Sequence, residues 1–222
     1  EDNGSEAATL GTELHARAEA ALKGECEPCE ATQFYVSFCR QLAAQKDAEM
    51  IVEARVPLFY SREEHGYADC VIRTDDTVHV IDLKTGSISV DAVNNYQLFV
   101  YAYGMGMTST ERFTMTIIQN DEAKSWSVDM NQADAIASVI GVKAQAALNP
   151  YINELNASDE ACMWCPCKPW CKAYTAKLLE NFDDLTSDMV KLSDEKQAYL
   201  FAHKSQITKA LNAIEASLFS RV

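Results

Sequence analysis

The stretch Gly66-Tyr-Ala-Asp-Cys-Val-Ile-Arg-Thr-Asp-Asp-Thr-Val-His-Val-Ile-Asp-Leu-Lys-Thr-Gly86 decides the fold prediction. It predicts two β-strands joined by a tight polar turn at residues 74–77. Side chains alternate between the faces of a strand, so Asp82 and Lys84 share a face of the second strand. Asp69 lies on the first strand, where it can meet Asp82 across the hairpin. The stretch therefore predicts two carboxylates and an ammonium group at one end of a hairpin.

Two carboxylates and a lysine at one point suit the binding of a hard divalent cation. Mg²⁺ prefers oxygen ligands and keeps several waters, so one or two carboxylates and a phosphate are enough. The metal activates a water, while a nearby lysine orients the nucleophile or stabilises the developing anion. The alternative is a solvated Asp-x-Lys tripeptide on a surface hairpin, which is common by chance. Motifs elsewhere in the chain are needed to decide between the two.

The length and composition of the chain indicate an α/β globular protein. Its 222 residues are 48% hydrophobic and 23% charged, a globular rather than a disordered balance. No run of 18 apolar residues and no secretory signal is visible, so we expect a cytoplasmic protein without a membrane partner. The net charge of −14 argues against a generally basic nucleic-acid-binding surface, although it leaves room for a local basic groove.

Helical and strand patterns flank the hairpin on both sides. The expected helices cover residues 5–23, 31–45, 91–105, 131–148 and 193–219. The expected additional strands lie in 49–60, ending at Pro57, in 113–119 and in 125–128. The pattern predicts a core at 1–150 that includes an N-terminal helical part. A cysteine-rich loop and C-terminal helices at 151–222 are expected to pack on this core, giving one compact domain.

Other elements offer further polar side chains for the hairpin site. His15 and Glu19 are four residues apart on one helix, so they share a face. Either can reach a metal held by Asp69 and Asp82, with histidine supplying a neutral imidazole. The alternative for both is a solvated pair. Glu53 is either an outer acid of the same site or an ordinary charge at the edge of the sheet.

The helix expected at 91–105 carries Gln97 and Tyr101 on one broad face with Gly104. Gln97 can hold a substrate phosphate or fix Lys84, and Tyr101 can contact a nucleic-acid backbone. The alternative is core packing by Tyr101, with Gly104 allowing a close approach of the helix to the sheet.

Four of the eight cysteines lie within ten residues. They are Cys162, Cys165, Cys167 and Cys171. The spacing Cys-x2-Cys-x5-Cys lets one loop wrap a zinc ion or an iron–sulfur cluster and suits a reducing cytosol. The fourth ligand stays open between Cys167, Cys26 or Cys29, and a cysteine upstream of Glu1.

Five motifs occur in order and resemble the RecB-like branch of the PD-(D/E)xK nucleases, which includes CRISPR-associated nucleases with iron–sulfur clusters. They are Gly11-Thr-x-x-His15-x-x-x-Glu19, Gly66-x-Ala-Asp69, Ile81-Asp82-Leu-Lys84-Thr-Gly86, Gln97-x-x-x-Tyr101-x-x-Gly104 and the C-terminal Cys-x2-Cys-x5-Cys. The likeness spans residues 11–172. The chain is also similar to a phage and prophage family known only as one of unknown function.

The resemblance implies a restriction-endonuclease-like core, in which a mixed central sheet is flanked by helices. It implies that Mg²⁺ or Mn²⁺ is held by the following groups: His15, Asp69, Asp82 and the main-chain carbonyl of Leu83, with Glu19 and Glu53 as further candidates. Lys84 would assist the attacking water, and Gln97 and Tyr101 would support the site.

The resemblance also implies a [4Fe–4S] cluster on Cys162, Cys165 and Cys171. The chain departs from the relatives here, because their first cluster cysteine lies upstream of the histidine motif. Without that cysteine, a zinc-filled or empty loop is the alternative.

The implied function is a metal-dependent DNA nuclease, an exonuclease in preference to an endonuclease, in bacterial or phage recombination or DNA processing. The implied partners are DNA and a phage recombination or single-strand-binding protein, and an oligomer is compatible with this reading. A non-catalytic DNA-binding or scaffold protein that retains the fold is the rival. The acidic composition favours the rival, whereas the complete set of His15, Asp69, Asp82 and Lys84 favours the enzyme. A plain zinc-binding module leaves the sheet motifs unexplained.

Overall fold

The structure is a computed structural model with two compact units, Glu1–Pro150 and Tyr151–Val222. It describes residues 3–61, 63–106, 109–149, 155, 157–163, 165–177, 193–195, 198, 201, 204, 208 and 212. The first unit contains all of the helices and strands around the hairpin and is described first.

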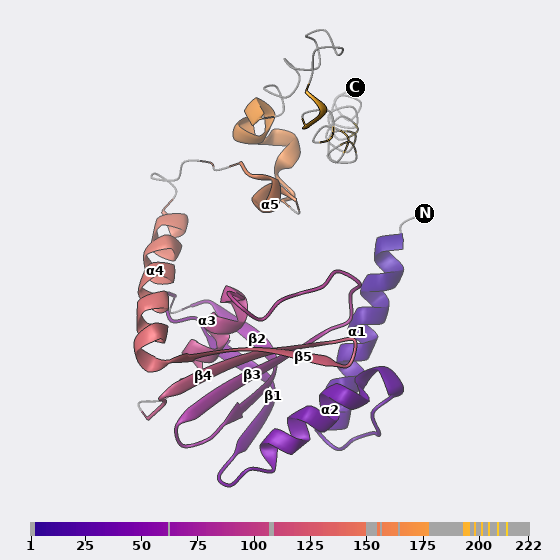
Figure 1. The fold of residues 1–222 in the computed structure, drawn as a ribbon, viewed down its shortest axis with the longest axis vertical. Coiled ribbons are helices and arrows are strands. Elements are labelled where there is room, and N and C mark those ends of the chain that lie inside the picture. Colours follow the sequence, from indigo (N-terminus) through magenta and orange to yellow (C-terminus); the bar gives the residue numbers. More distant parts are fainter. Residues whose placement is uncertain are drawn as a thin grey trace. The chain divides into compact units, whose positions relative to one another are not determined.

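One five-stranded sheet, in the order β1-β2-β3-β4-β5, forms the centre of the first unit (Figure 1). Its strands are β1 (Glu49–Pro57), β2 (His65–Arg73), β3 (Thr77–Lys84), β4 (Arg112–Gln119) and β5 (Glu122–Asp129). The pairs β1–β2, β2–β3 and β4–β5 are antiparallel, whereas β3 and β4 are parallel. The predicted mixed sheet is therefore confirmed, and its central strand is the second strand of the hairpin.

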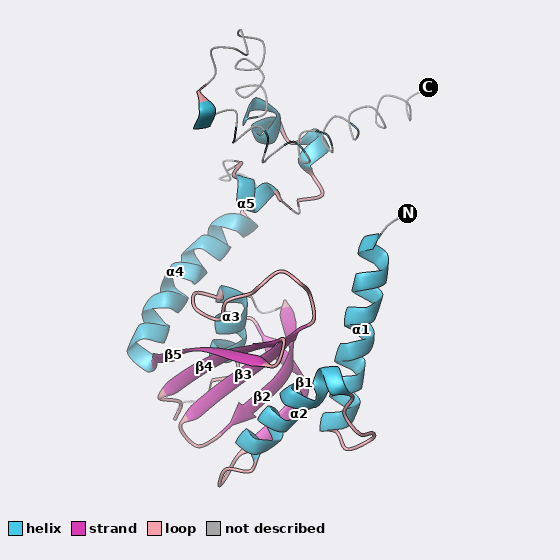
Figure 2. Ribbon diagram, turned by 45° about the vertical axis from the view of Figure 1, so that its right-hand side comes forward, coloured by secondary structure: helices cyan, strands magenta, loops and turns pink. Residues whose placement is uncertain are grey.

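Helices cover both faces of the sheet (Figure 2). They are α1 (Asn3–Leu22), α2 (Glu30–Ala43), α3 (Tyr96–Gly104) and α4 (Met130–Leu148). The side facing α1 and α2 buries Ala18, Ala21, Leu22, Tyr35, Val36, Cys39, Cys70, Ile72, Ile81, Leu83 and Ile118. The side facing α3 and α4 includes Val71, Val78, Val80, Leu98, Phe99, Phe113, Met115, Ile117 and Ala133. Because β3 and β4 are covered on both faces, most of their residues are buried, including polar ones.

The start of α3 differs from the sequence prediction. Helix α3 begins at Tyr96, because the side chain of Asn95 caps it by accepting the Leu98 N–H, and the expected start at 91 was wrong. Strand β1 ends at Pro57, where the sequence pattern places its end. The expected stop of α1 at Gly24 is confirmed: this glycine has a φ of +78°, a conformation that suits a helix end.

Gly104 ends α3 where that helix touches the end of β1. A Cβ atom at position 104 would lie 2.2 Å from the carbonyl oxygen of Pro57, a backbone atom that cannot move aside as a flexible side chain could. We therefore expect Gly104→Ala to lower the free energy of unfolding by about 1–3 kcal/mol in urea titrations. Gly86→Ala is the matched control, because no atom lies within 4 Å of a Cβ there. Equal stability of the two variants would contradict the close approach.

Among its described residues the second unit has the short elements α5 (Asp159–Cys162) and the 3₁₀ helix η1 (Lys168–Trp170), and residues 172–177 are also helical. The helix predicted at 193–219 lies outside the described residues except for isolated positions. In the part of the chain that the structure describes, no helix is both long and apolar enough to cross a membrane.

Candidate functional site

The two strands of the hairpin separate at Asp69 and Asp82. Strands β2 and β3 pair from Arg73↔Val78 as far as Cys70↔Ile81, as the alternation predicts. The next step of the ladder is replaced by a side-chain contact, in which the Leu83 N–H donates to Asp69 Oδ2 at 2.8 Å. The Asp69 carboxylate thus accepts the hydrogen bond of the Leu83 amide at the point where β2 and β3 no longer pair.

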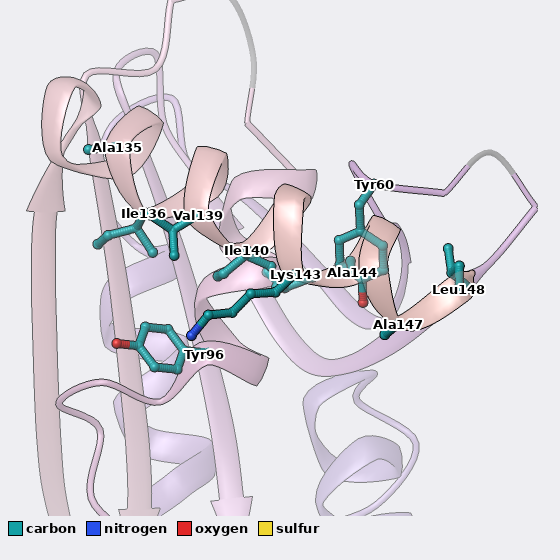
Figure 3. Close-up of a pocket in the computed structure, with 11 residues that line it drawn as sticks. Tyr60, Tyr96, Ala135, Ile136, Val139, Ile140, Lys143, Ala144, Ala147 and Leu148 are labelled. Atoms are coloured by element: carbon teal, nitrogen blue, oxygen red, sulfur yellow. The ribbon is translucent and has the colours of Figure 1, made fainter. Parts of the chain in front are cut away.

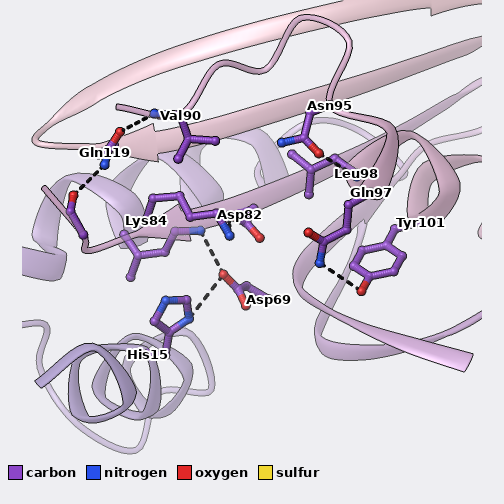
Figure 4. Close-up of polar contacts among 12 residues, drawn as sticks. His15, Asp69, Asp82, Lys84, Val90, Asn95, Gln97, Leu98, Tyr101 and Gln119 are labelled. Carbon is purple, nitrogen blue, oxygen red and sulfur yellow. Dashed lines mark hydrogen bonds and ion pairs between the residues drawn. The ribbon is translucent and has the colours of Figure 1, made fainter. Parts of the chain in front are cut away.

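We call His15, Asp69, Asp82 and Lys84 the fork site, because they meet where β2 and β3 part (Figure 4). His15 comes from α1, and its Nδ1 lies 3.4 Å from Asp69 Oδ2. Lys84 Nζ lies 2.8 Å from Asp82 Oδ2. The structure therefore brings together four of the side chains that the sequence nominated, from three separate elements.

Burial dominates the electrostatics of the fork site. Asp82 is only 8% exposed, and burial raises the pKa of its carboxyl, helped by the negative charge of Asp69 and opposed by Lys84. The hydrogen bond to Asp69 raises the pKa of His15 against the effect of partial burial. Although Lys84 lies within ion-pair distance, no described residue makes a well-directed hydrogen bond to Asp82 Oδ2. This buried oxygen has unused capacity to bind a ligand.

Glu53 stands opposite Asp69 in an unusual backbone conformation. The flanking register pairs are Val52↔Cys70 and Ala54↔Ala68, and Glu53 between them has a φ of +50°. Non-glycine residues rarely adopt this left-handed region. Strand β1 changes faces here, because Ile51 and Ala54, three residues apart, both pack in the core beneath α3.

A small cavity adjoins the fork site, with room for about one water molecule. His15, Glu19, Tyr35, Glu53 and Asp69 contribute to its lining. Burial raises the pKa of Glu53, and the negative charges nearby raise it further. The buried Tyr35 hydroxyl makes no hydrogen bond within the described part of the chain. Glu19 pairs with Lys23 on its own helix. Because Glu19 and Glu53 line this cavity with His15 and Asp69, both further ligand candidates lie beside the fork site.

The donor types of the fork site suit a hard divalent cation. Carboxylate oxygens, an imidazole and the unsatisfied Asp82 Oδ2 are ligands that such cations accept. As the side chains stand, no three His, Cys, Asp or Glu residues among those described are grouped closely enough to hold a metal ion. A cation bound here would compete with Lys84 and His15 for the carboxylate oxygens that they contact. The Leu83 carbonyl belongs to β3, next to Ile118 of β4 in the ladder.

The structure places Gln97 and Tyr101 one turn apart on α3. Gln97 Nε2 donates to Tyr101 Oη at 3.2 Å (Figure 4), and within the described residues it does not bond to Lys84. The Tyr101 ring packs on Gly66, where a Cβ atom would lie 2.4 Å from the ring. The glycine of the Gly66-x-Ala-Asp69 motif thus makes room for this ring.

Gln119 is a supporting residue that sequence reasoning missed. It is 7% exposed at the end of β4, beside Lys84 in the parallel ladder. Its Oε1 accepts the Val90 N–H at 3.0 Å, and its Nε2 donates to the carbonyls of Gly86 and Ile88 at 2.6 and 2.9 Å. It holds the loop that follows Lys84 (Figure 4). The signal that could have identified it is a lone glutamine at the end of the alternating stretch 113–118.

The cysteine residues are all free thiols. In the second unit Cys162 is buried, Cys167 is exposed, and the Sγ of Cys171 accepts the Tyr174 N–H at 3.5 Å. The described residues do not gather three of these thiols around one point. In the first unit Cys29 begins α2 from an extended backbone conformation. The predicted cluster therefore stays a prediction.

A larger groove of about 730 Å³ lies away from the fork site (Figure 3). It is lined by one side of α4 together with Tyr60, Tyr96 and Val100. Lys143 is its one Lys, Arg, His, Asp or Glu residue, and the rest of the lining is apolar or tyrosine. The groove therefore lacks the paired groups that acid–base or metal chemistry needs.

The sequence model of a family described as a protein of unknown function (DUF2800) matches residues 27–222. The chain belongs to this family. In this DUF2800 member, Asp69, Asp82 and Lys84 lie inside the matched stretch and His15 precedes it. No curated protein matches the sequence. Among solved structures, the crystal structure of SSO0001 is similar at 19% identity, over 75% of this chain and 71% of that chain, with a TM-score of 0.37.

Proposed function

We propose that the protein is a metal-dependent deoxyribonuclease, acting as an exonuclease in recombination or DNA processing, with the fork site as its active centre. The observation that carries the proposal is the meeting of His15, Asp69, Asp82 and Lys84 where β2 and β3 separate. The mixed sheet with helices on both faces is compatible with a restriction-endonuclease-like fold of the PD-(D/E)xK class.

Each side chain of the fork site has a role in this proposal. Asp69, Asp82 and His15 would hold Mg²⁺ or Mn²⁺, which supplies an activated water and stabilises negative charge on the phosphate. The Leu83 N–H fixes Asp69 from one side, so this carboxylate is oriented before a substrate arrives. Lys84 Nζ, released from Asp82, can donate to the phosphate or to the attacking water. Gln97 and Tyr101 brace each other on α3 beside this centre.

The rival function is a DNA-binding or scaffold protein without catalysis. The net charge of −14 favours it, since a nuclease without a broad basic surface attracts DNA weakly. The buried Asp82 disfavours the scaffold function, because burying a carboxylate lowers stability and a scaffold has no use for a buried carboxylate.

Cleavage of end-labelled linear DNA and of closed circular DNA separates these functions. We expect the full-length protein to degrade linear DNA with Mg²⁺ or Mn²⁺, to leave circular DNA intact, and to stop in EDTA. Cleavage of the circular form would replace the exonuclease by an endonuclease. Failure to cut either form, in protein that binds DNA, would contradict the nuclease and favour the scaffold.

A further inference from the structure

Three exposed side chains lie together at the end of the β1–β2 hairpin. We call Arg55, His65 and Tyr67 the hairpin patch. Arg55 and Tyr67 are direct partners in the antiparallel ladder. The His65 ring meets the Tyr67 ring edge to face at 5.4 Å between centroids, and Arg55 Nη2 lies 3.4 Å from His65 Nδ1. Tyr67 is nevertheless 57% exposed, so the patch presents its rings to solvent.

The hairpin patch runs directly into the fork site. Alternate residues of a strand share a face, so His65, Tyr67 and Asp69 follow one another at steps of about 7 Å. Ala68 and Ala54, which lie between them in the two strands, turn to the core beneath α3. The patch residues therefore face the opposite side, from which α1 delivers His15 to Asp69.

The chemistry of the hairpin patch fits unpaired nucleotides. Exposed aromatic rings stack on bases, and a guanidinium group stacks on bases or binds phosphate. Within the described residues no ion pair ties Arg55 to a carboxylate. In a chain with a net charge of −14, this leaves an available cation beside two exposed rings. A duplex hides the faces of its bases, so stacking favours a single strand.

We propose that the hairpin patch binds single-stranded DNA and guides its end into the fork site, an inference that rests on the proposed nuclease function. Tyr67 stacks on a base adjacent to the phosphate at the fork site, His65 supports the Tyr67 ring, and Arg55 contacts a neighbouring phosphate. The substrate of the nuclease is then a DNA end with unpaired nucleotides.

Binding can be measured without cleavage, using fluorescein-labelled oligonucleotides in EDTA and following their anisotropy. We expect the wild-type protein to bind a single strand more tightly than a blunt duplex of the same sequence. Tyr67→Ala should weaken single-strand binding about tenfold, and Tyr67→Phe should retain it because stacking persists. Arg55→Ala should weaken binding and reduce its salt dependence by about one phosphate contact. The matched controls are Tyr96→Ala, at a tyrosine 54% exposed on α3, and Arg112→Ala at the opposite end of the sheet; both should bind as wild type.

The outcomes separate this inference from the nuclease proposal. Unchanged binding by Tyr67→Ala, or equal losses in Tyr67→Ala and Tyr96→Ala, overturns the hairpin patch even if the protein cuts DNA. Selective loss in Tyr67→Ala upholds the hairpin patch even if the wild-type protein cuts no DNA, and the nuclease proposal alone then fails. Tighter binding of the blunt duplex also overturns the inference.

Discussion

Lys84→Ala is expected to reduce metal-dependent DNA cleavage by at least about 100-fold, the loss that follows removal of one positioned donor at a developing charge. Lys84 supplies the one ammonium group of the fork site, and its Nζ already lies 2.8 Å from Asp82. It also lowers the pKa of Asp82, which burial raises. Without Lys84 that pKa rises further, so the residual activity should move to higher pH. Single-turnover cleavage rates across a pH series measure both effects.

A companion variant separates loss of chemistry from loss of fold. Asp82→Asn should also abolish cleavage, yet it removes a buried negative charge that lies near Asp69. Because the raised pKa of Asp82 means that the folded state disfavours its ionised carboxylate, the free energy of unfolding should be maintained or rise. Lys124→Ala is the matched lysine control, because Lys124 hydrogen-bonds to Ser89 outside the fork site. Cleavage by Lys84→Ala within about threefold of the wild-type rate would contradict the proposed role.

The β2–β3 hairpin could be predicted because its sequence alternation agrees with the burial of its residues. Two-residue alternation in 66–73 and 77–84 places Asp69 and Asp82 in the same row of the hairpin, and the observed register has the same alignment. The sequence motifs also predicted that His15, from the N-terminal helix, and Lys84 would join these two carboxylates in one site. The family resemblance then implied a mixed sheet flanked by helices, and helices cover both faces of the observed sheet.

The local geometry of the fork site could not be predicted from the two-residue periodicity of the strands. Alternation treats a strand as regular, whereas Glu53 adopts a φ of +50° and turns the strand over. A regular hairpin would place the Leu83 amide in the β2–β3 ladder, but the Asp69 side chain binds it instead. Both features depend on contacts between strands that a single segment does not encode. Gln119 was missed for the same reason, because its three partners lie about thirty residues away in the chain.

Acid is expected to destabilise the sheet through His79, a residue of β3 on the side facing α2. The edge of its ring packs against Phe38, with ring centroids 6.2 Å apart, and its Nε2 lies 2.6 Å from the buried Thr116 Oγ1. The Thr116 hydroxyl also contacts Ser125 Oγ at 2.7 Å. Burial lowers the pKa of His79 from 6.5 to about 4.

The direction in which pH changes the stability follows from the pKa of His79 in the folded and unfolded states. The unfolded chain takes up a proton at His79 as the pH falls below 6.5, whereas the folded protein does so only near pH 4. Stability is therefore fully present above pH 6.5 and is lost as the pH falls from 6.5 to about 4, by as much as about 3 kcal/mol. Urea unfolding at several pH values in this window, followed by circular dichroism, measures the loss.

His79→Gln isolates this contribution, because glutamine keeps a hydrogen-bonding group near Thr116 but carries no proton equilibrium. Glu53 and Asp82, whose pKa values are raised in the folded state, oppose the loss in acid, but they do so equally in both proteins. Between pH 7 and pH 4, the wild-type protein should therefore lose about 3 kcal/mol more free energy of unfolding than His79→Gln loses. His65→Gln, at an exposed histidine, should follow the wild-type slope. Parallel slopes for wild type and His79→Gln would show that the folded state accepts a proton at His79 as readily as the unfolded chain.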